Sequence, residues 1–387
     1  MKTWFTSLDR HNRDAYKLDK AIEMSGREDV LALSVADSDY ETAPAIKEAL
    51  LDRTDHGAFG YSGIPKDFAP IIKAWFKRRY NFSIKPHWVV PAPKVLNALC
   101  VLMQTLSNPK DKVLIQPPVY HVFKPAILEN NRVVVENELI KTKEGYRIDF
   151  GDFEAKLKEG VKLFMLCSPH NPVGRVYTDA ELKRMVQLCK AYDVTILSDE
   201  IHADLIMENH HFISMAHYHD LYEKIIVISA PSKTFNIAGL QVAYMVIPNN
   251  EIRKHVKKTY NALHLSGPNL LAYTALKAAY TKSDDWVDAQ NKHIKINYNH
   301  LKAFIEAHSD KAWIAPLEGT YLAWIDMHFT GLNSETIIDG LTTQGLVVSD
   351  GKTFSEHTDT FIRVNLACSE ANMLLAIQRL KTYLETL

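Results

Sequence analysis

The chain has 387 residues and a composition typical of a globular protein, with 47% hydrophobic and 24% charged side chains. Its formal net charge of −1 excludes the basic surface of a nucleic-acid-binding protein, and no apolar run is long enough to cross a membrane. The length exceeds what one ordinary hydrophobic core organises, so we expect two domains.

Short apolar runs alternate with helical patterns in the middle of the chain. The clearest helix covers residues 178–192, where Thr178 and Glu181 form a capping box ahead of an apolar face. Alternation of strands and helices is typical of a mostly parallel α/β sheet. The runs that we expect to be strands buried on both faces are 112–116, 132–136, 161–167, 194–198 and 224–229.

The last third of the chain has a different pattern. Two long helical stretches, about 250–280 and 284–308, are followed by shorter elements that predict a small α+β domain. These shorter elements are a strand at 320–326, a helix near 334–343, a strand at 361–366 and a terminal helix. We therefore predict a large domain over 46–285 and a small domain made of 1–45 and 286–387.

The cysteines and the N-terminus bear on the cellular compartment of the protein. No two of the four cysteines form a Cys-x-x-Cys pair, so neither a zinc knuckle nor a disulfide framework is indicated. Cys100, Cys167 and Cys189 lie in apolar runs and are expected to be buried free thiols. Because the N-terminus also has no apolar signal region, we predict a cytoplasmic protein. The adjacent His210 and His211 have no third ligand in view, and we expect a solvated loop there rather than a metal site.

Polar side chains follow three of the predicted strands. Asn171, Asp199 and Lys233 each come directly or shortly after a buried apolar run. In an open α/β sheet, ligands bind beyond the carboxyl ends of the strands. The sequence therefore predicts that these three side chains lie along one crevice.

An amide, a carboxylate and a lysine in one crevice suit pyridoxal 5′-phosphate (PLP). Lysine forms the Schiff base, a carboxylate keeps the pyridine nitrogen protonated, and an amide can bind the phenolic oxygen. The phosphate normally lies at a helix N-terminus. Each residue alone has an ordinary alternative, since Lys233 can be a solvated loop lysine, Asp199 a helix N-cap and Asn171 part of a turn. Their ordered combination favours the cofactor.

Longer motifs around these residues resemble a known family. The segments "SPHNPVGRV" (168–176), "SDEIHADL" (198–205) and "SAPSKTFNIAGLQ" (229–241) are similar to the signatures of fold-type I PLP-dependent enzymes, the aspartate aminotransferase superfamily. The likeness is strongest to the cystathionine β-lyase branch of the MalY/PatB type and extends over about residues 30–385. It implies a large domain with a mostly parallel central sheet flanked by helices, plus a smaller α+β domain. Further matching motifs are "VADSDY", "DHGAFGYS", "QPPVYHVF", "EGTYLAWID" and "FIRVNLACS".

The resemblance implies a role for each matching residue. Lys233 would hold the cofactor and move the Cα proton, with Tyr120 near the ring face as a second catalytic group. Arg363 would bind the substrate α-carboxylate. Tyr61 would reach the cofactor phosphate of the neighbouring subunit and also contact the substrate there, which implies a homodimer with shared active sites. The remaining implied cofactor contacts are Asp199, Asn171, His202, Ser232, Lys94 and Val95, and the remaining implied substrate contacts are Asn171 and Ala36.

Four of these residues have an ordinary structural alternative. His202 fits a hydrogen-bonded structural histidine, Arg363 a structural ion pair, and Tyr120 and Tyr61 packing aromatics. An arginine inside an apolar strand is costly without an anion, which favours the carboxylate-binding interpretation of Arg363.

The sequence departs from the family pattern at three positions. Lys94 stands where relatives usually have glycine at the start of the phosphate-binding helix. Gln241 stands where many aminotransferases carry a phosphate-binding arginine, and the lyase branch often lacks that arginine too. Ser34 replaces an aromatic residue ahead of "VAD", which predicts a larger or wetter substrate pocket.

The activity implied is a PLP-dependent carbon–sulfur β-lyase. It would release a thiol, pyruvate and ammonia from an S-substituted L-cysteine such as cystathionine, with neither nucleic acid nor membrane as a partner. Two alternatives remain open at this point. The first is a class I/II aminotransferase, which differs in yielding a keto acid, and the second is a catalytically silent PLP-binding regulatory protein.

Overall fold

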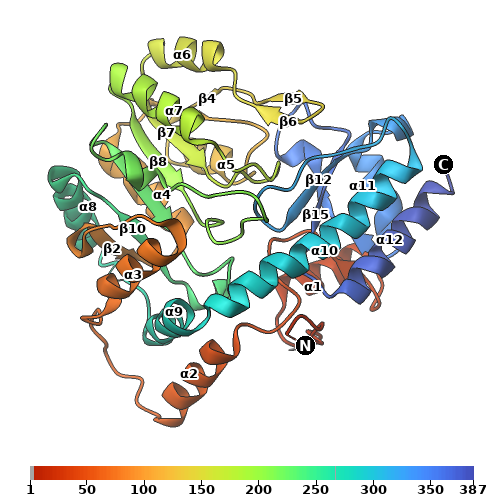
Figure 1. Cartoon of the computed structure of the whole chain (residues 1–387), viewed down its shortest axis with the longest axis horizontal. Coiled ribbons are helices and arrows are strands. Elements are labelled where there is room, and N and C mark those ends of the chain that lie inside the picture. Colours follow the sequence, from red (N-terminus) through yellow and green to blue (C-terminus); the bar gives the residue numbers. More distant parts are fainter. Residues whose placement is uncertain (1–3, 266) are drawn as a thin grey trace.

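The computed structural model describes residues 4–265 and 267–387 (Figure 1). Its largest element is a seven-stranded sheet in which one strand, β10, runs antiparallel to both neighbours and the others run parallel to one another. The mostly parallel sheet is therefore confirmed. In spatial order the strands are β2 (Val89–Ala92), β10 (Ala243–Val246), β9 (Ile225–Ser229), β8 (Thr195–Asp199), β7 (Val161–Cys167), β3 (Lys112–Ile115) and β4 (Val133–Glu136).

The five predicted strands are confirmed to within one residue at each end. Strands β2 and β10 were absent from the prediction, although β10 lies within an apolar run at 242–247. Pro91 inside β2 also argues against a strand, since proline donates no ladder hydrogen bond.

Helices cover both faces of this sheet. On β7, Leu163 and Met165 join one hydrophobic core, whereas Phe164 and Leu166 join the other. This two-sided burial is the reason for the nearly continuous apolar runs. Helices α4 (Val95–Leu106), α5 (Phe123–Glu129) and α8 (Asn250–Ala262) contribute to the first core, and α6 (Phe150–Lys158) and α7 (Asp179–Ala191) to the second.

The predicted capping box is present at the start of α7. The Thr178 hydroxyl accepts from the Glu181 N–H at 3.3 Å, and the Glu181 carboxylate accepts from the Thr178 N–H at 2.9 Å. Two otherwise orphan donors are satisfied, which fixes where this helix begins.

The stretch predicted as one helix over 250–280 is two helices. Helix α8 ends at Ala262, and α9 (Leu270–Lys282) begins after the Asn269 side chain accepts from the Ala272 N–H. Between them, Gly267 has φ +104 and Pro268 cannot continue a helix. The long helical prediction failed because the apolar periodicity resumes on the far side of this break.

The C-terminal part is built on a second sheet. Its four antiparallel strands are β11 (Trp313–Ile314), β12 (Leu322–Asp326), β15 (Phe361–Asn365) and β14 (Ser349–Asp350). Helix α11 (Ser334–Thr343) matches its predicted range, and α12 (Glu370–Leu384) is the predicted terminal helix. The long helix α10 (Asp284–His308) packs on α9 and also on α12 and β11 (Figure 1).

The N-terminal residues lie against this C-terminal part. Strand β1 (Leu31–Ala32) pairs in parallel with β13 (Leu346–Val347). The predicted domain limits at 45/46 and 285/286 remain a prediction. The other elements are α1 (Tyr16–Ser25), α2 (Pro44–Asp55), α3 (Phe68–Tyr80) and the hairpin of β5 (Ile140–Thr142) and β6 (Gly145–Arg147).

The structure corrects one cysteine. Cys167 and Cys189 are buried free thiols as predicted, and so is Cys368, but Cys100 is half-buried. It lies on α4, on the side of the helix that is partly exposed to solvent. Across residues 4–265 and 267–387, no helix is both long and apolar enough to cross a membrane.

Candidate active site

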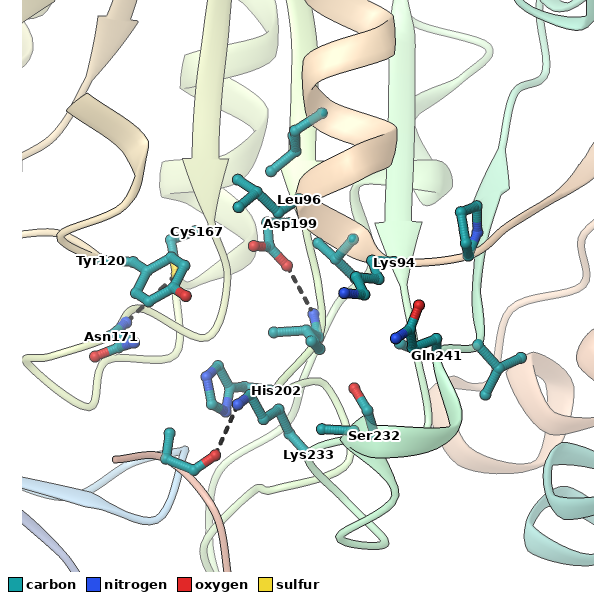
Figure 2. Close-up of a pocket in the computed structure, with 18 residues that line it drawn as sticks. Lys94, Leu96, Tyr120, Cys167, Asn171, Asp199, His202, Ser232, Lys233 and Gln241 are labelled. Carbon is teal, nitrogen blue, oxygen red and sulfur yellow. Dashed lines mark hydrogen bonds between the residues drawn. The ribbon is translucent and has the colours of Figure 1, made fainter. Parts of the chain in front are cut away.

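A cavity of about 220 Å³ lies beyond the carboxyl ends of β7, β8 and β9 (Figure 2). Its walls come from segments far apart in sequence, including the start of α4 and the turn after β9. The predicted crevice is thus present. The predicted site residues that line it are Ala36, Lys94, Val95, Tyr120, Asn171, Asp199, His202, Ser232 and Lys233.

Lys233 lies in the turn that follows β9. Its Nζ donates to the Ala36 carbonyl at 2.7 Å. Desolvation lowers the pKa of Lys233 to about 8, and the nearby Arg363 guanidinium acts in the same direction, while Asp37 and Asp199 oppose it. A lysine in this state is partly neutral near physiological pH and can act as a nucleophile or base.

Asp199 is the last residue of β8 and is buried. One carboxylate oxygen accepts from the Ile201 N–H at 3.1 Å, and the other has no hydrogen-bond partner within the described chain. Burial raises the pKa of Asp199 to about 7. Such a carboxylate is stabilised by a cation, or by an N–H donor of a ligand, placed in the cavity.

Arg363 of β15 does not line the cavity itself but lies next to it, in contact with Asn171, which does. The guanidinium donates to the Asn171 side-chain oxygen at 3.0 Å, to the Ser34 carbonyl at 2.8 Å and to the Ser349 hydroxyl at 3.0 Å. Its Nε is buried without a partner, and no carboxylate of the described residues pairs with it. Burial lowers its pKa to about 10. This cation therefore suits an anionic ligand.

His202 and Tyr120 also line the cavity, and their side chains form few hydrogen bonds to the described part of the chain. His202 is buried, its Nδ1 has no hydrogen-bond partner among the described residues, and its ring meets Tyr321 edge-on at 5.9 Å. Burial lowers the pKa of His202 to about 3, so the ring is neutral. Tyr120 is half-buried, and burial raises its pKa. Figure 2 shows the Tyr120 ring beside Asn171 and the His202 ring beside Lys233.

The N-terminus of α4 faces the cavity. Lys94 precedes the helix with φ −147° and ψ 152°, an extended conformation that any L-residue adopts, so glycine is not required there. No side chain caps this helix end, which leaves the first backbone N–H groups available to an anion. Ser232 lines the same cavity.

Tyr61 lies apart from this cavity. It belongs to the segment between α2 and α3, and its side chain is fully exposed. His210 and His211 are also exposed, beside a separate cavity of about 920 Å³ between the end of α3 and α10.

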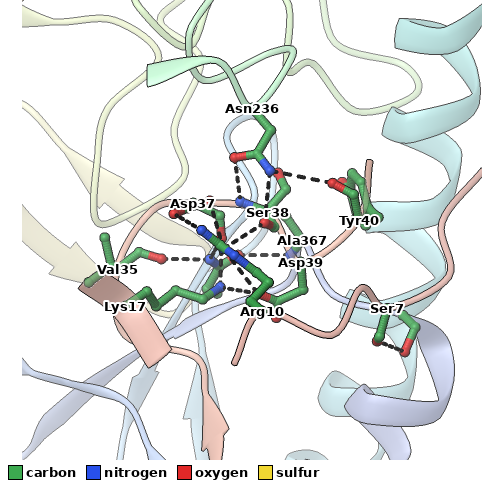
Figure 3. Close-up of polar contacts among 12 residues, drawn as sticks. Ser7, Arg10, Lys17, Val35, Asp37, Ser38, Asp39, Tyr40, Asn236 and Ala367 are labelled. Atoms are coloured by element: carbon green, nitrogen blue, oxygen red, sulfur yellow. Dashed lines mark hydrogen bonds and ion pairs between the residues drawn. The ribbon is translucent and has the colours of Figure 1, made fainter. Parts of the chain in front are cut away.

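Residues 33–40, which we call the N-terminal strap, cross the site and carry the Lys233 partner Ala36. Asn236, three residues after Lys233, exchanges hydrogen bonds with the strap backbone at 2.9 and 3.2 Å (Figure 3). Asn365, two residues after Arg363, donates to two strap carbonyls at 2.7 and 2.8 Å. The strap therefore links the lysine turn to the strand that carries the arginine.

A charge cluster holds the strap from its outer side. Lys17 of α1 is buried and places its Nζ 2.6 Å from an Asp39 carboxylate oxygen and 2.7 Å from the Asp37 carbonyl. Arg10 pairs with Asp37 at 3.1 Å and lies 3.9 Å from Asp39 (Figure 3). Burial raises the pKa of Asp39, and Lys17 opposes that shift.

Lys17→Met is expected to lower the free energy of unfolding by about 2–3 kcal/mol, because among the described residues Asp39 then keeps Arg10, at 3.9 Å, as its one counter-charge. Urea denaturation measures this change. The matched control is Lys20→Met on the exposed side of the same helix, expected to cost about 0.5 kcal/mol or less. Equal losses in the two variants would show that the buried pair does not hold the strap.

Comparison with known proteins identifies the family. A family model described as "Aminotransferase class I and II" matches residues 28–380. The chain belongs to this family. Cystathionine beta-lyase PatB of Bacillus subtilis (strain 168) is 35% identical over 379 residues, covering 97% of this chain and 98% of that protein. Protein MalY of Escherichia coli (strain K12) is 33% identical over 371 residues, covering 95% of this chain and 94% of that protein.

A solved structure has the same fold as this chain. Cystalysin from Treponema denticola, whose crystal structure contains a pyridoxal 5′-phosphate cofactor, has a TM-score of 0.95 and 30% identity, covering 100% of this chain and 99% of that chain. The fold-type I architecture and the likeness to the MalY/PatB branch, both predicted from sequence, are confirmed.

Some contacts in this class I/II aminotransferase fold were not predicted. Lys17 looks like an ordinary charged residue of an amphipathic helix. Ser349 lies on a two-residue strand with no apolar pattern. Asn365 was also not predicted, but the sequence does carry a signal for it. It lies two residues from Arg363 on the same strand, so both side chains share one face.

Proposed function

We propose that this protein is a PLP-dependent carbon–sulfur β-lyase that acts on S-substituted L-cysteines such as L-cystathionine. The observation that carries the proposal is the meeting of Lys233, Asp199 and the α4 N-terminus in one cavity. The names of relatives such as cystathionine beta-lyase PatB, and the PLP in cystalysin, support it.

The residues present fit PLP. Lys233 would bond the aldehyde, Asp199 would face the pyridine nitrogen, and Asn171 and Tyr120 would contact the ring. The α4 N-terminus with Lys94, Val95 and Ser232 would hold the phosphate, while His202 would present its unpartnered Nδ1. When bound, PLP supplies an electron sink for the pair left at Cα after proton loss.

The protein's own groups would then bind substrate and move protons. Arg363, beside Asn171 and Ala36, would hold the α-carboxylate and so orient the Cα–H bond toward Lys233. Once the substrate's amino group has taken its place on the cofactor, the freed Lys233 amine would take the Cα proton as a general base. As the Cβ–S bond breaks, Lys233 or Tyr120 gives the sulfur a proton and it leaves as a thiol. The remaining enamine hydrolyses with water to pyruvate and ammonia.

A homodimer with shared active sites and a cytoplasmic location belong to the same proposal. The segment between α2 and α3 exposes three large apolar side chains, Phe59, Tyr61 and Ile64. Tyr61 does not line the cavity of its own chain. If Tyr61 entered the active site of a second copy of the chain, that copy would cover the exposed apolar side chains of this segment.

The test is to follow pyruvate and free thiol together after adding L-cystathionine to PLP-loaded protein. We expect equal amounts of both and an unchanged cofactor spectrum after turnover. A keto acid that retains the sulfur, with conversion of the cofactor to its amine form, would assign an aminotransferase instead. Bound PLP with no product from any sulfur amino acid would assign a silent binding protein.

The lysine pKa predicts how the PLP-free protein takes up its cofactor. Only the neutral amine attacks the aldehyde, so we expect the rate of PLP attachment to rise about tenfold per pH unit below about 8 and to level off above it. Stopped-flow visible absorbance measures this rate. A rate that still climbs through pH 10 would mean that Lys233 keeps an ordinary lysine pKa.

A further inference from the structure

A second pocket adjoins the cofactor cavity at Tyr120. It encloses about 390 Å³ between residues 115–128, with Glu136, and residues 352–357. Tyr120 lines both cavities, so a single side chain joins them. We call this second space the outer pocket.

The outer pocket begins one side chain away from Arg363. The Arg363 guanidinium lies 4.7 Å from the centre of the Phe354 ring. His121 meets the same ring edge-on at 5.6 Å, and the Val119 N–H donates to the Phe354 carbonyl at 3.2 Å. These contacts join the two walls of the pocket. Because Phe354 lines the outer pocket and contacts Arg363, the pocket lies next to the group that we propose to hold the α-carboxylate.

The charges in the outer pocket are unevenly paired. Lys124 places its Nζ 3.2 Å from Glu136 and 3.4 Å from Glu356, so two carboxylates share one ammonium. Lys352 lines the same pocket and forms no ion pair within the described parts of the chain. The pocket thus presents one surplus negative and one surplus positive charge.

The other titratable groups do not change this balance. Burial lowers the pKa of His121 to about 4, so its ring is neutral. His357 lies 3.6 Å from Glu138, a carboxylate outside the pocket lining. Burial raises the pKa of Tyr120, which is neutral as well.

We propose that the outer pocket binds the dipolar end of an amino-acid leaving group, with the ammonium at Glu136 and Glu356 and the carboxylate at Lys352. This inference rests on the proposed lyase function and specifies its substrate class. L-Cystathionine carries such a dipole beyond its sulfur, whereas an S-alkyl-L-cysteine ends in an apolar group. The pocket therefore selects dipolar thioethers over alkyl thioethers.

The test compares kcat/KM for L-cystathionine and S-ethyl-L-cysteine in the PLP-loaded protein. In Lys352→Met and in Glu136→Gln with Glu356→Gln, we expect a loss of roughly fivefold for L-cystathionine and less than about twofold for S-ethyl-L-cysteine. The matched control is Lys162→Met, an exposed lysine near the opposite end of β7, which should change neither value.

A binding measurement separates this inference from turnover. On a Lys233→Ala background loaded with PLP, calorimetry should show the Lys352→Met change weakening L-cystathionine by a similar factor and leaving S-ethyl-L-cysteine unaffected. Equal effects on both ligands, or none on either, would overturn the outer-pocket proposal. Release of no pyruvate from either substrate by the unsubstituted protein would instead overturn the lyase function.

Discussion

Lys233→Ala is expected to reduce kcat with L-cystathionine by about 10⁴-fold and to remove the visible absorbance of the cofactor-loaded protein. The amine lies in a desolvated cavity, and its pKa of about 8 makes it both nucleophile and base. Among the residues that the structure describes, the only other lysine that lines the site is Lys94, which is exposed. Spectra and steady-state rates measured on the same preparation test both losses.

The matched control for this substitution lies at the other end of the same strand. Lys224 precedes β9 and pairs with Asp193 on the surface at 2.6 Å. Because exposed pairs contribute about 1 kcal/mol or less, Lys224→Ala should keep the absorbance and the rate. If Lys233→Ala retained more than about a tenth of the activity, the assignment of the catalytic lysine would be wrong.

Much of the large sheet could be predicted because its strands are buried on both faces. β7 and β8 lie in nearly continuous apolar runs for that reason, so a polar residue that follows such a run stands out in the sequence. Asp199 and Lys233 were found in this way. Of the two strands that were missed, β2 is interrupted by Pro91, whereas β10 lies in an apolar run at 242–247 that could have been recognised as a strand.

Contacts between distant segments could not be predicted from local pattern. Arg363 meets Asn171 across 192 positions of sequence, and the geometry that joins them depends on how the second sheet packs against the first. Lys17 gives no local sign that it is buried, because its partner Asp39 belongs to an irregular segment. The residue types were enough to predict the chemistry. The hydrogen bonds and ion pairs that hold the strap over Lys233 could be identified only from the three-dimensional fold.

Asp199→Asn is expected to reduce kcat by about 10²–10³-fold with little change in stability. The amide keeps the side chain's volume and can still accept from the Ile201 N–H. It cannot carry the negative charge that would keep a pyridine nitrogen protonated, so the electron sink weakens. Single-turnover kinetics under PLP saturation, with the visible spectrum as a check on cofactor binding, measure this loss.

The neighbouring Glu200 provides a stringent control. It is buried like Asp199, but its carboxyl group lies outside the cofactor cavity that Asp199 lines. Its Oε1 accepts from the Ser198 hydroxyl at 3.0 Å and the Met215 N–H at 2.7 Å, and it does not line the cofactor cavity. Burial raises the pKa of Glu200 to about 8, so the group is largely protonated at neutral pH and glutamine replaces it without loss of charge. Glu200→Gln should therefore keep kcat within about twofold. Equal losses in Asp199→Asn and Glu200→Gln would mean that burial of a carboxyl at the end of β8, rather than its charge toward the cofactor, supports activity.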